Sequence, residues 1–207
     1  MRDHTVICTA LRYEANAISR LPGARVEVIG LRGSLLPRID LAGVGAIVLA
    51  GLAGALDPSL AVGDVIVDER STLGALRESA RRRIHTATQM ICTVADKGAL
   101  FRSTGAAAVD MEADAVFALA AERKLPCLHV RAISDAADHA IDPAVFRLTD
   151  SSGNVRPTAL ALELLRRPTL VAGLTRLQSR SKLALRNLCD ALNQLGSASE
   201  KNLNQLP

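Results

Sequence analysis

Short apolar segments alternate with segments of helical spacing along most of this chain, and this alternation limits its fold more than any other feature. Val44–Ala50 is apolar on both faces, as central strands of a parallel sheet are. Further strands are expected at Thr5–Ala10, Arg25–Ile29, Val65–Val67, Gln89–Val94, Ala106–Val109 and Pro126–Ile133. Helices are expected at Leu11–Leu21 and Glu112–Arg123. The pattern predicts an α/β protein in which helices cover both faces of a mostly parallel sheet.

The length of 207 residues suits one main domain, but the character of the sequence changes beyond Pro143. We expect a catalytic domain over residues 1–150, C-terminal helices over 151–196 that pack on or extend it, and a flexible tail over 197–207. Thr158–Arg167 has helical spacing, and the stretch after it predicts an amphipathic helix with a basic outer face. Ser71–His85 is polar and basic, which indicates an exposed connection.

Composition excludes several classes of protein. The chain is 49% hydrophobic and 22% charged, which is typical of a globular domain and excludes a disordered one. Only 2% of residues are aromatic, too few for a protein that stacks nucleic-acid bases. No apolar run approaches the ~18 residues of a membrane span. The net charge of +4 arises mainly between Arg156 and Asp190, so it says little about the main domain.

Cysteine and histidine usage indicates a cytoplasmic protein that holds no metal. The 4 cysteines form no CxxC pair, and no signal peptide is recognisable at the start, so we expect free thiols in a reducing compartment. The 4 histidines lack metal-ligand spacing.

Four segments place a glycine turn or a carboxylate close to the end of an expected strand, where ligands of α/β proteins bind. Gly51–Asp64 (GLAGALDPSLAVGD) opens with a Gly-rich turn that lets a ligand approach the backbone. Val109–Glu112 contains an acidic pair, Arg131–Asp138 contains a serine followed by two aspartates, and Glu14 follows the first strand. Each has a purely structural alternative: a tight turn, a helix cap, or a solvated side chain.

Taken together, these segments resemble the superfamily of nucleoside phosphorylases and methylthioadenosine–adenosylhomocysteine nucleosidases. Gly51–Asp64 is similar to its Gly-rich motif, Val109–Glu112 to its ribose-binding segment and Arg131–Asp138 to its catalytic-acid segment. The resemblance covers roughly residues 4–140. It implies a three-layer αβα fold of the phosphorylase/hydrolase type, with a central mixed, mostly parallel sheet.

The resemblance also implies roles for individual residues. Asp135 would be the general acid that protonates N7 of adenine, oriented by Ser134, and a water-poor pocket would hold it protonated. Glu112 would accept hydrogen bonds from both ribose hydroxyls, and its charge would favour the oxocarbenium-like transition state. Glu14 would activate water, and Met111 would pack under the ribose or simply belong to the core. The expected substrate-binding positions also include Asp110, Gly51, Ala53, Gly54 and Val94.

The nucleophile stays open between water and phosphate. Leu49 and Leu52 stand where many phosphorylases of the superfamily have arginine and Ser/Thr, and a buried leucine cannot hold a phosphate dianion. This favours hydrolysis, although Arg12 and Arg32 could supply a positive group. No cofactor is expected, and phosphate is a co-substrate only if the reaction is phosphorolytic.

A narrower resemblance lies in the C-terminal part. Arg156–Pro157, Leu164–Pro168 and the Leu-rich basic helix after them are similar to hopanoid-associated phosphorylases. This implies release of adenine from adenosylhopane during hopanoid synthesis. The basic helices would then rest on an anionic bilayer, or else pack on the sheet or on a subunit of a homo-oligomer.

Two other functions are alternatives to cleavage of a nucleoside. A non-catalytic nucleoside-binding protein would have no need for Glu14, Glu112 and Asp135 together. A dinucleotide-dependent oxidoreductase would need a GxGxxG motif after the first strand, which the sequence lacks.

Overall fold

The computed structural model describes residues 4–73, 80–143, 148, 163, 167 and 170–203. The expected C-terminal features at Arg156–Pro157 and Leu164–Arg166, and most of the helix expected at Thr158–Arg167, lie outside these residues. The described helices are α1 (Arg12–Ile18), α2 (Val94–Thr104), α3 (Ala113–Arg123) and α6 (Leu170–Leu203). The strands are β1 (Thr5–Thr9), β2 (Arg25–Val28), β3 (Ala46–Ala55), β4 (Val65–Asp68), β5 (Arg81–Arg82), β6 (Ile84–Thr86), β7 (Ala108–Asp110) and β8 (Cys127–Asp135).

The strands form one mixed, mostly parallel sheet in the order β2-β1-β3-β8-β4-β5. β1 is parallel to β2 and β3, and β3 is parallel to β8, whereas β4 runs antiparallel to β8. β7 pairs antiparallel with the end of β3 and parallel with β6. The predicted fold class is therefore confirmed.

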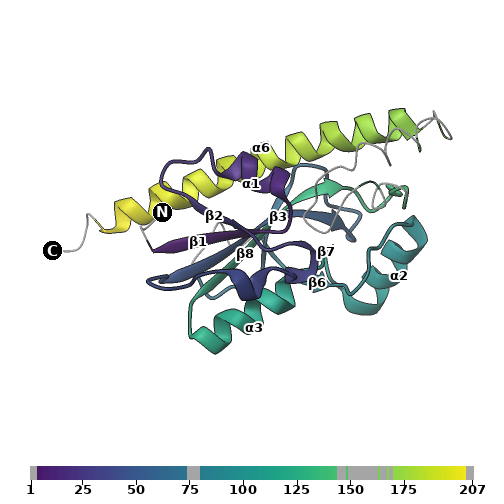
Figure 1. Ribbon diagram of the computed structural model, residues 1–207. Coiled ribbons are helices and arrows are strands. Elements are labelled where there is room, and N and C mark those ends of the chain that lie inside the picture. The colour runs from purple at the N-terminus through teal and green to yellow at the C-terminus, as the bar shows by residue number, and fades with distance from the viewer. Residues whose placement is uncertain are drawn as a thin grey trace.

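Helices cover both faces of the sheet, as Figure 1 shows: α1 and α6 lie over one face, α3 lies across the other, and α2 lies beyond one end. The side under α1 and α6 is a core of aliphatic side chains from β1, β3, β4 and β8 together with Ile18 and Leu188. On the side of α3, Val116 and Ala120 pack against β1 and β3. Within the described residues, no helix is long and apolar enough to cross a membrane.

The structure differs from the predicted elements in three places. Gln89–Val94 is not a strand: Thr93 caps α2 by accepting a hydrogen bond from the Asp96 backbone N–H at 3.0 Å, and Val94 is the first residue of the helix. The segment expected as an exposed connection contains β5 and β6, because Ile84 is buried beside Ala108 of β7. α6 continues to Leu203, past the expected start of a tail at Ser197.

The basic amphipathic helix predicted near the C-terminus is α6, and its middle part packs on the sheet. Ala184, Leu185, Leu188, Ala191 and Leu192 are buried and join the core beneath α6. Their 3/4 spacing produces the apolar stripe that the sequence indicates. α6 thus completes a layer of the domain.

We expect Leu188→Ala to lower the free energy of unfolding by about 2–5 kcal/mol, because Leu188 is fully buried and the change leaves a cavity under α6. Leu183→Ala, on the same helix but 48% exposed, should change it by less than about 0.5 kcal/mol. Urea unfolding of both variants measures the two values, and equal values would show that α6 does not contribute to the core.

Candidate functional site

The expected site residues lie at one edge of the sheet because β1, β3 and β8 are parallel neighbours. Glu14 stands on α1, directly after β1, and Asp135 is the last residue of β8. Gly51 and Gly54 of β3 are the register partners of Arg131 and Asp135 on β8. Gly54 is three positions after Gly51 along β3, so the two pairs are roughly 10 Å apart.

Arg131 joins the carboxylates at one of these two positions. Its side chain is fully buried, and Nη2 donates hydrogen bonds to Asp110 Oδ2 at 2.6 Å and to Glu112 Oε2 at 3.1 Å. Burial alone would suppress ionisation of Asp110, but the charge of Arg131 outweighs it and holds the pKa of Asp110 well below its usual range. The Arg32 backbone N–H donates to the other carboxylate oxygen of Glu112 at 3.1 Å.

A buried histidine fixes the plane of this guanidinium. Arg131 Nε donates to His129 Nε2 at 2.8 Å, and His129 Nδ1 lies 3.0 Å from Asp68 Oδ2. Because Nε2 accepts, the ring proton belongs on Nδ1, where it is donated to Asp68. Arg70 in turn donates to the same carboxylate at 2.8 Å. A line of hydrogen-bonded side chains, Arg70, Asp68 and His129, therefore runs from the surface to Arg131.

Glu14 is buried beside Arg131 and held by two backbone amides. Leu52 N donates to Oε1 at 2.9 Å and Leu11 N donates to Oε2 at 3.0 Å. Burial raises the pKa of Glu14 to about 7, although the positive charge of Arg131 and the two amides oppose the rise. A carboxyl group with this pKa can accept a proton near neutral pH.

Gly51 makes room for this arrangement. A Cβ at position 51 would lie 2.3 Å from Arg131 Nη1 and 3.0 Å from Glu14 Oε1. Arg131 Nη1 is buried and has no hydrogen-bond partner within the described residues. A donor without a partner therefore lies next to Glu14, where it can bind an oxygen atom.

Asp135 lies at the second position, against Gly54, and its two carboxylate oxygens have different partners. Ser134 Oγ donates to Oδ1 at 2.7 Å. The Lys97 ammonium from α2 forms a buried ion pair with Oδ2. A water-poor environment was expected around this acid; Asp135 is buried, and its partner there is the buried Lys97.

The other predicted positions take different places. Ala53 contributes its carbonyl oxygen, which lies 3.3 Å from Ser134 Oγ. Asp110 is buried behind Glu112 and supports Arg131. Met111 is half-buried, and Val94 is exposed at the start of α2.

Sequence reasoning missed the residues that support these carboxylates. Arg131 lies within a motif that was recognised, but nothing in the motif showed that its guanidinium turns inward. Asp68 and His129 lie in strands, where a buried ion pair leaves no periodic signal. The helix that carries Lys97 could have been predicted, because Thr93 and Gly105 are typical start and stop residues of a helix.

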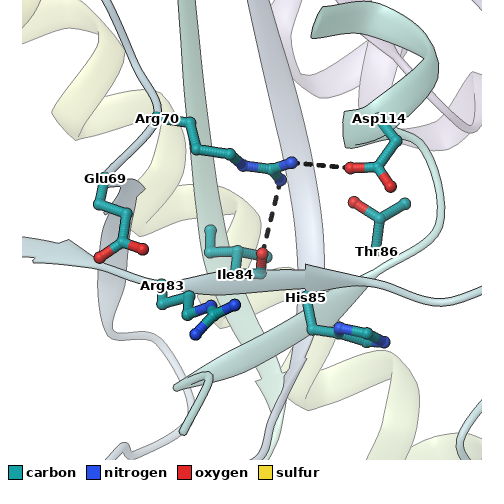
Figure 2. A pocket seen from close by; sticks show the side chains of 7 residues that line it. All are labelled: Glu69, Arg70, Arg83, Ile84, His85, Thr86 and Asp114. Carbon is teal, nitrogen blue, oxygen red and sulfur yellow. Dashed lines mark hydrogen bonds and ion pairs between the residues drawn. The ribbon is translucent and has the colours of Figure 1, made fainter. Parts of the chain in front are cut away.

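A hollow of about 230 Å³ lies beside Arg70, at the surface end of the line of side chains that leads to Arg131. Figure 2 shows Arg70 reaching across it to Asp114 and to the Ile84 carbonyl oxygen. None of the predicted catalytic residues lines it. In the part of the chain that the structure describes, no three His, Cys, Asp or Glu side chains gather so that they can hold a metal ion.

Comparison with known proteins gives one family match and several structures of similar fold. The sequence model of the Phosphorylase superfamily matches residues 69–166. Comparison with curated protein sequences gives no match. Among solved structures, futalosine hydrolase of Helicobacter pylori is 17% identical, with a TM-score of 0.61 over 94% of this chain and 97% of that one.

Two nucleosidases for 5′-methylthioadenosine and S-adenosylhomocysteine are also similar. The enzyme of Helicobacter pylori is 18% identical, with a TM-score of 0.62 over 94% of this chain and 97% of its own. The enzyme of Campylobacter jejuni is 16% identical, with a TM-score of 0.56 over 92% and 98%. This chain has the nucleosidase fold. The similarity to these solved structures is one of fold, and the Phosphorylase superfamily model matches residues 69–166 of the chain.

We expect Gly51→Ala to destabilise the protein by about 1–3 kcal/mol, because the added methyl group overlaps Arg131 Nη1 and forces a fully buried side chain to move. Gly173→Ala is the matched control: nothing lies within 4 Å of its added Cβ, and alanine favours the helix α6. It should raise the melting temperature. Thermal unfolding of both variants measures the contrast, and a Gly51→Ala variant as stable as the unmodified protein would contradict the described packing.

Proposed function

We propose that this protein hydrolyses the N-glycosidic bond of a purine nucleoside. The observation behind the proposal is the pairing of two different carboxyl sites along β3 and β8. Glu14, Arg131 and Glu112 form one site beside Gly51, and Asp135 forms the other beside Gly54. Their spacing of roughly 10 Å suits a nucleoside that lies lengthwise, with its sugar at the first site and its base at the second.

Water is activated at the first site. The backbone amides of Leu11 and Leu52 hold Glu14 in place, and each of its oxygens keeps a further lone pair for an incoming water proton. The unpartnered Nη1 of Arg131 can donate to the oxygen of that water. Positioning of this kind turns attack on the sugar into an effectively unimolecular step.

The ribose is recognised by Glu112. Arg131 and the Arg32 backbone each bond one of its oxygens, so the carboxyl group is fixed in direction. Two acceptor oxygens match the two hydroxyls of a cis-diol. The negative charge also stabilises the positive charge that develops on the sugar as the C–N bond breaks.

The purine leaves from the second site. An adenine anion is a poor leaving group, so N7 must receive a proton as the bond breaks. Asp135 is the acid in this proposal, and Ser134 fixes its orientation through the hydrogen bond to Oδ1.

Hydrolysis is preferred over phosphorolysis because of what surrounds the sugar position. Leu49 is fully buried in the core, and Leu52 contributes only its backbone amide, which is bonded to Glu14. The single positive charge of Arg131 is already shared between the carboxylates of Asp110 and Glu112, so no excess positive charge remains for a phosphate dianion.

Adenosylhopane is the substrate that we propose for this site, on the strength of the C-terminal resemblance. The exposed face of α6 carries Arg176, Lys182 and Arg186, which can meet the anionic surface where a hopanoid would lie. We propose a cytoplasmic protein that associates with the membrane and acts as a homo-oligomer. Methylthioadenosine is the comparison substrate, since it occupies the active site of the Helicobacter pylori nucleosidase.

Hydrolysis should depend on pH through Glu14. Below about 7 the raised pKa leaves Glu14 protonated and unable to take a proton from water, so kcat/KM should fall as the pH is lowered through that value. Glu14→Gln should lower the rate by at least ~100-fold and abolish this limb of the profile. Glu122→Gln, with a side chain that is 70% exposed, is the control. An unchanged acid limb in Glu14→Gln would exclude Glu14 as the base.

Asp135→Asn should lower adenine release by at least ~100-fold without unfolding the protein. The assay is mass spectrometry of products from adenosylhopane and methylthioadenosine, with and without phosphate. Free sugar in the absence of phosphate is the expected product. Sugar 1-phosphate, formed only when phosphate is supplied, would establish phosphorolysis. Tight nucleoside binding with no release of adenine would establish a binding protein.

A further inference from the structure

Lys97 is the one buried side chain of α2, and it is fully buried. The helix carries it into the protein at the second site, where the carboxylate of Asp135 lies. A lysine is seldom found fully buried unless it is paired, because removing an ammonium ion from water is costly. The burial of Lys97 beside Asp135 therefore indicates a role for this lysine in the site.

The contacts of Lys97 use all three of its protons. Nζ donates to Asp135 Oδ2, to the Ala136 carbonyl oxygen at 2.9 Å and to the His139 carbonyl oxygen at 2.9 Å. Both carbonyls belong to the turn that follows β8, so the ammonium ion is held against the end of that strand. Lysine has three donors and no acceptor, and this environment satisfies it fully.

This ion pair creates a difficulty for the proposed reaction that Lys97 itself can resolve. Asp135 Oδ2 accepts a hydrogen bond from an ammonium ion, yet the proposed reaction requires Asp135 to give a proton to the leaving purine. Among the described residues that bond Asp135, the acidic proton is that of Lys97, which is already donated to Asp135 Oδ2. Ser134 cannot serve, since a serine hydroxyl is far weaker as an acid.

We propose that Lys97 is the proton reservoir of the site and acts through Asp135; this rests on the proposed function. As the C1′–N9 bond breaks, its electron pair goes to the purine. Lys97 passes a proton to Asp135 Oδ2 and becomes a neutral amine, while Asp135 passes a proton to N7, so the carboxylate is regenerated. Water adds to C1′ and passes its proton to Glu14. Solvent then removes the proton from Glu14 and returns one to Lys97, so that the cycle balances.

The test compares two leaving groups. A purine needs a proton in order to leave, whereas 4-nitrophenolate leaves from 4-nitrophenyl β-D-ribofuranoside as a stable anion. We expect Lys97→Met to lower kcat for methylthioadenosine by at least ~100-fold and kcat for the nitrophenyl riboside by less than about threefold. Glu14→Gln should lower both equally, and Lys124→Met, at an exposed position directly after α3, should lower neither.

An equal loss on both substrates in Lys97→Met would show a purely structural lysine and overturn this inference alone. Unchanged kcat for methylthioadenosine would overturn it as well. If Lys97→Met does not fold, Lys97→Gln, which can still donate to the Ala136 and His139 carbonyls, is held to the same two criteria. If the unmodified protein cleaves neither substrate, the proposed function fails, and this inference fails with it.

Discussion

The buried guanidinium of Arg131 is the interaction on which the site depends. Removing one partner from such a buried ion pair typically costs about 3–5 kcal/mol, because the other charge is left uncompensated. Arg131 binds Asp110 and Glu112 through Nη2 and lies beside Glu14 beneath Gly51. One positive charge thus allows three acidic side chains to be buried at the ends of separate strands. His129 and Asp68 set the plane of the guanidinium, and so determine the direction in which Glu112 faces.

The two carboxyl sites along β3 and β8 differ in their surroundings, and the chemistry assigned to each follows from that difference. Glu14 is near a positive charge but bonded only by amides, and burial raises its pKa to about 7. Asp135 is paired directly with an ammonium ion. One site is therefore suited to accept a proton, and the other is connected to a group that can supply one. Pairs of titratable groups with contrasting environments are how enzymes divide acid and base roles.

The fold was largely predictable. Buried strands require apolar runs, which the sequence shows at β1, β3 and β8, and a helix that packs on a sheet requires the helical spacing seen in α3. The segment after Ala87 was not, because α2 has a single buried residue and that residue is a lysine. The positions of Glu14, Glu112 and Asp135 followed from strand ends and motif resemblance. Their partners did not, because the pairings of Arg131 with Asp110 and of Lys97 with Asp135 join residues 21 and 38 positions apart. Contacts between distant strands and helices are set by tertiary packing, which local periodicity does not record.

The proposed reaction requires one nucleoside to span both carboxyl sites. A crystal structure of the Asp135→Asn variant soaked with methylthioadenosine would show whether it does. We expect the ribose diol on Glu112, C1′ facing Glu14 and N7 facing position 135. Nucleoside density confined to the hollow beside Arg70, or a ribose that does not touch Glu112, would show that the two carboxyl sites do not bind one nucleoside.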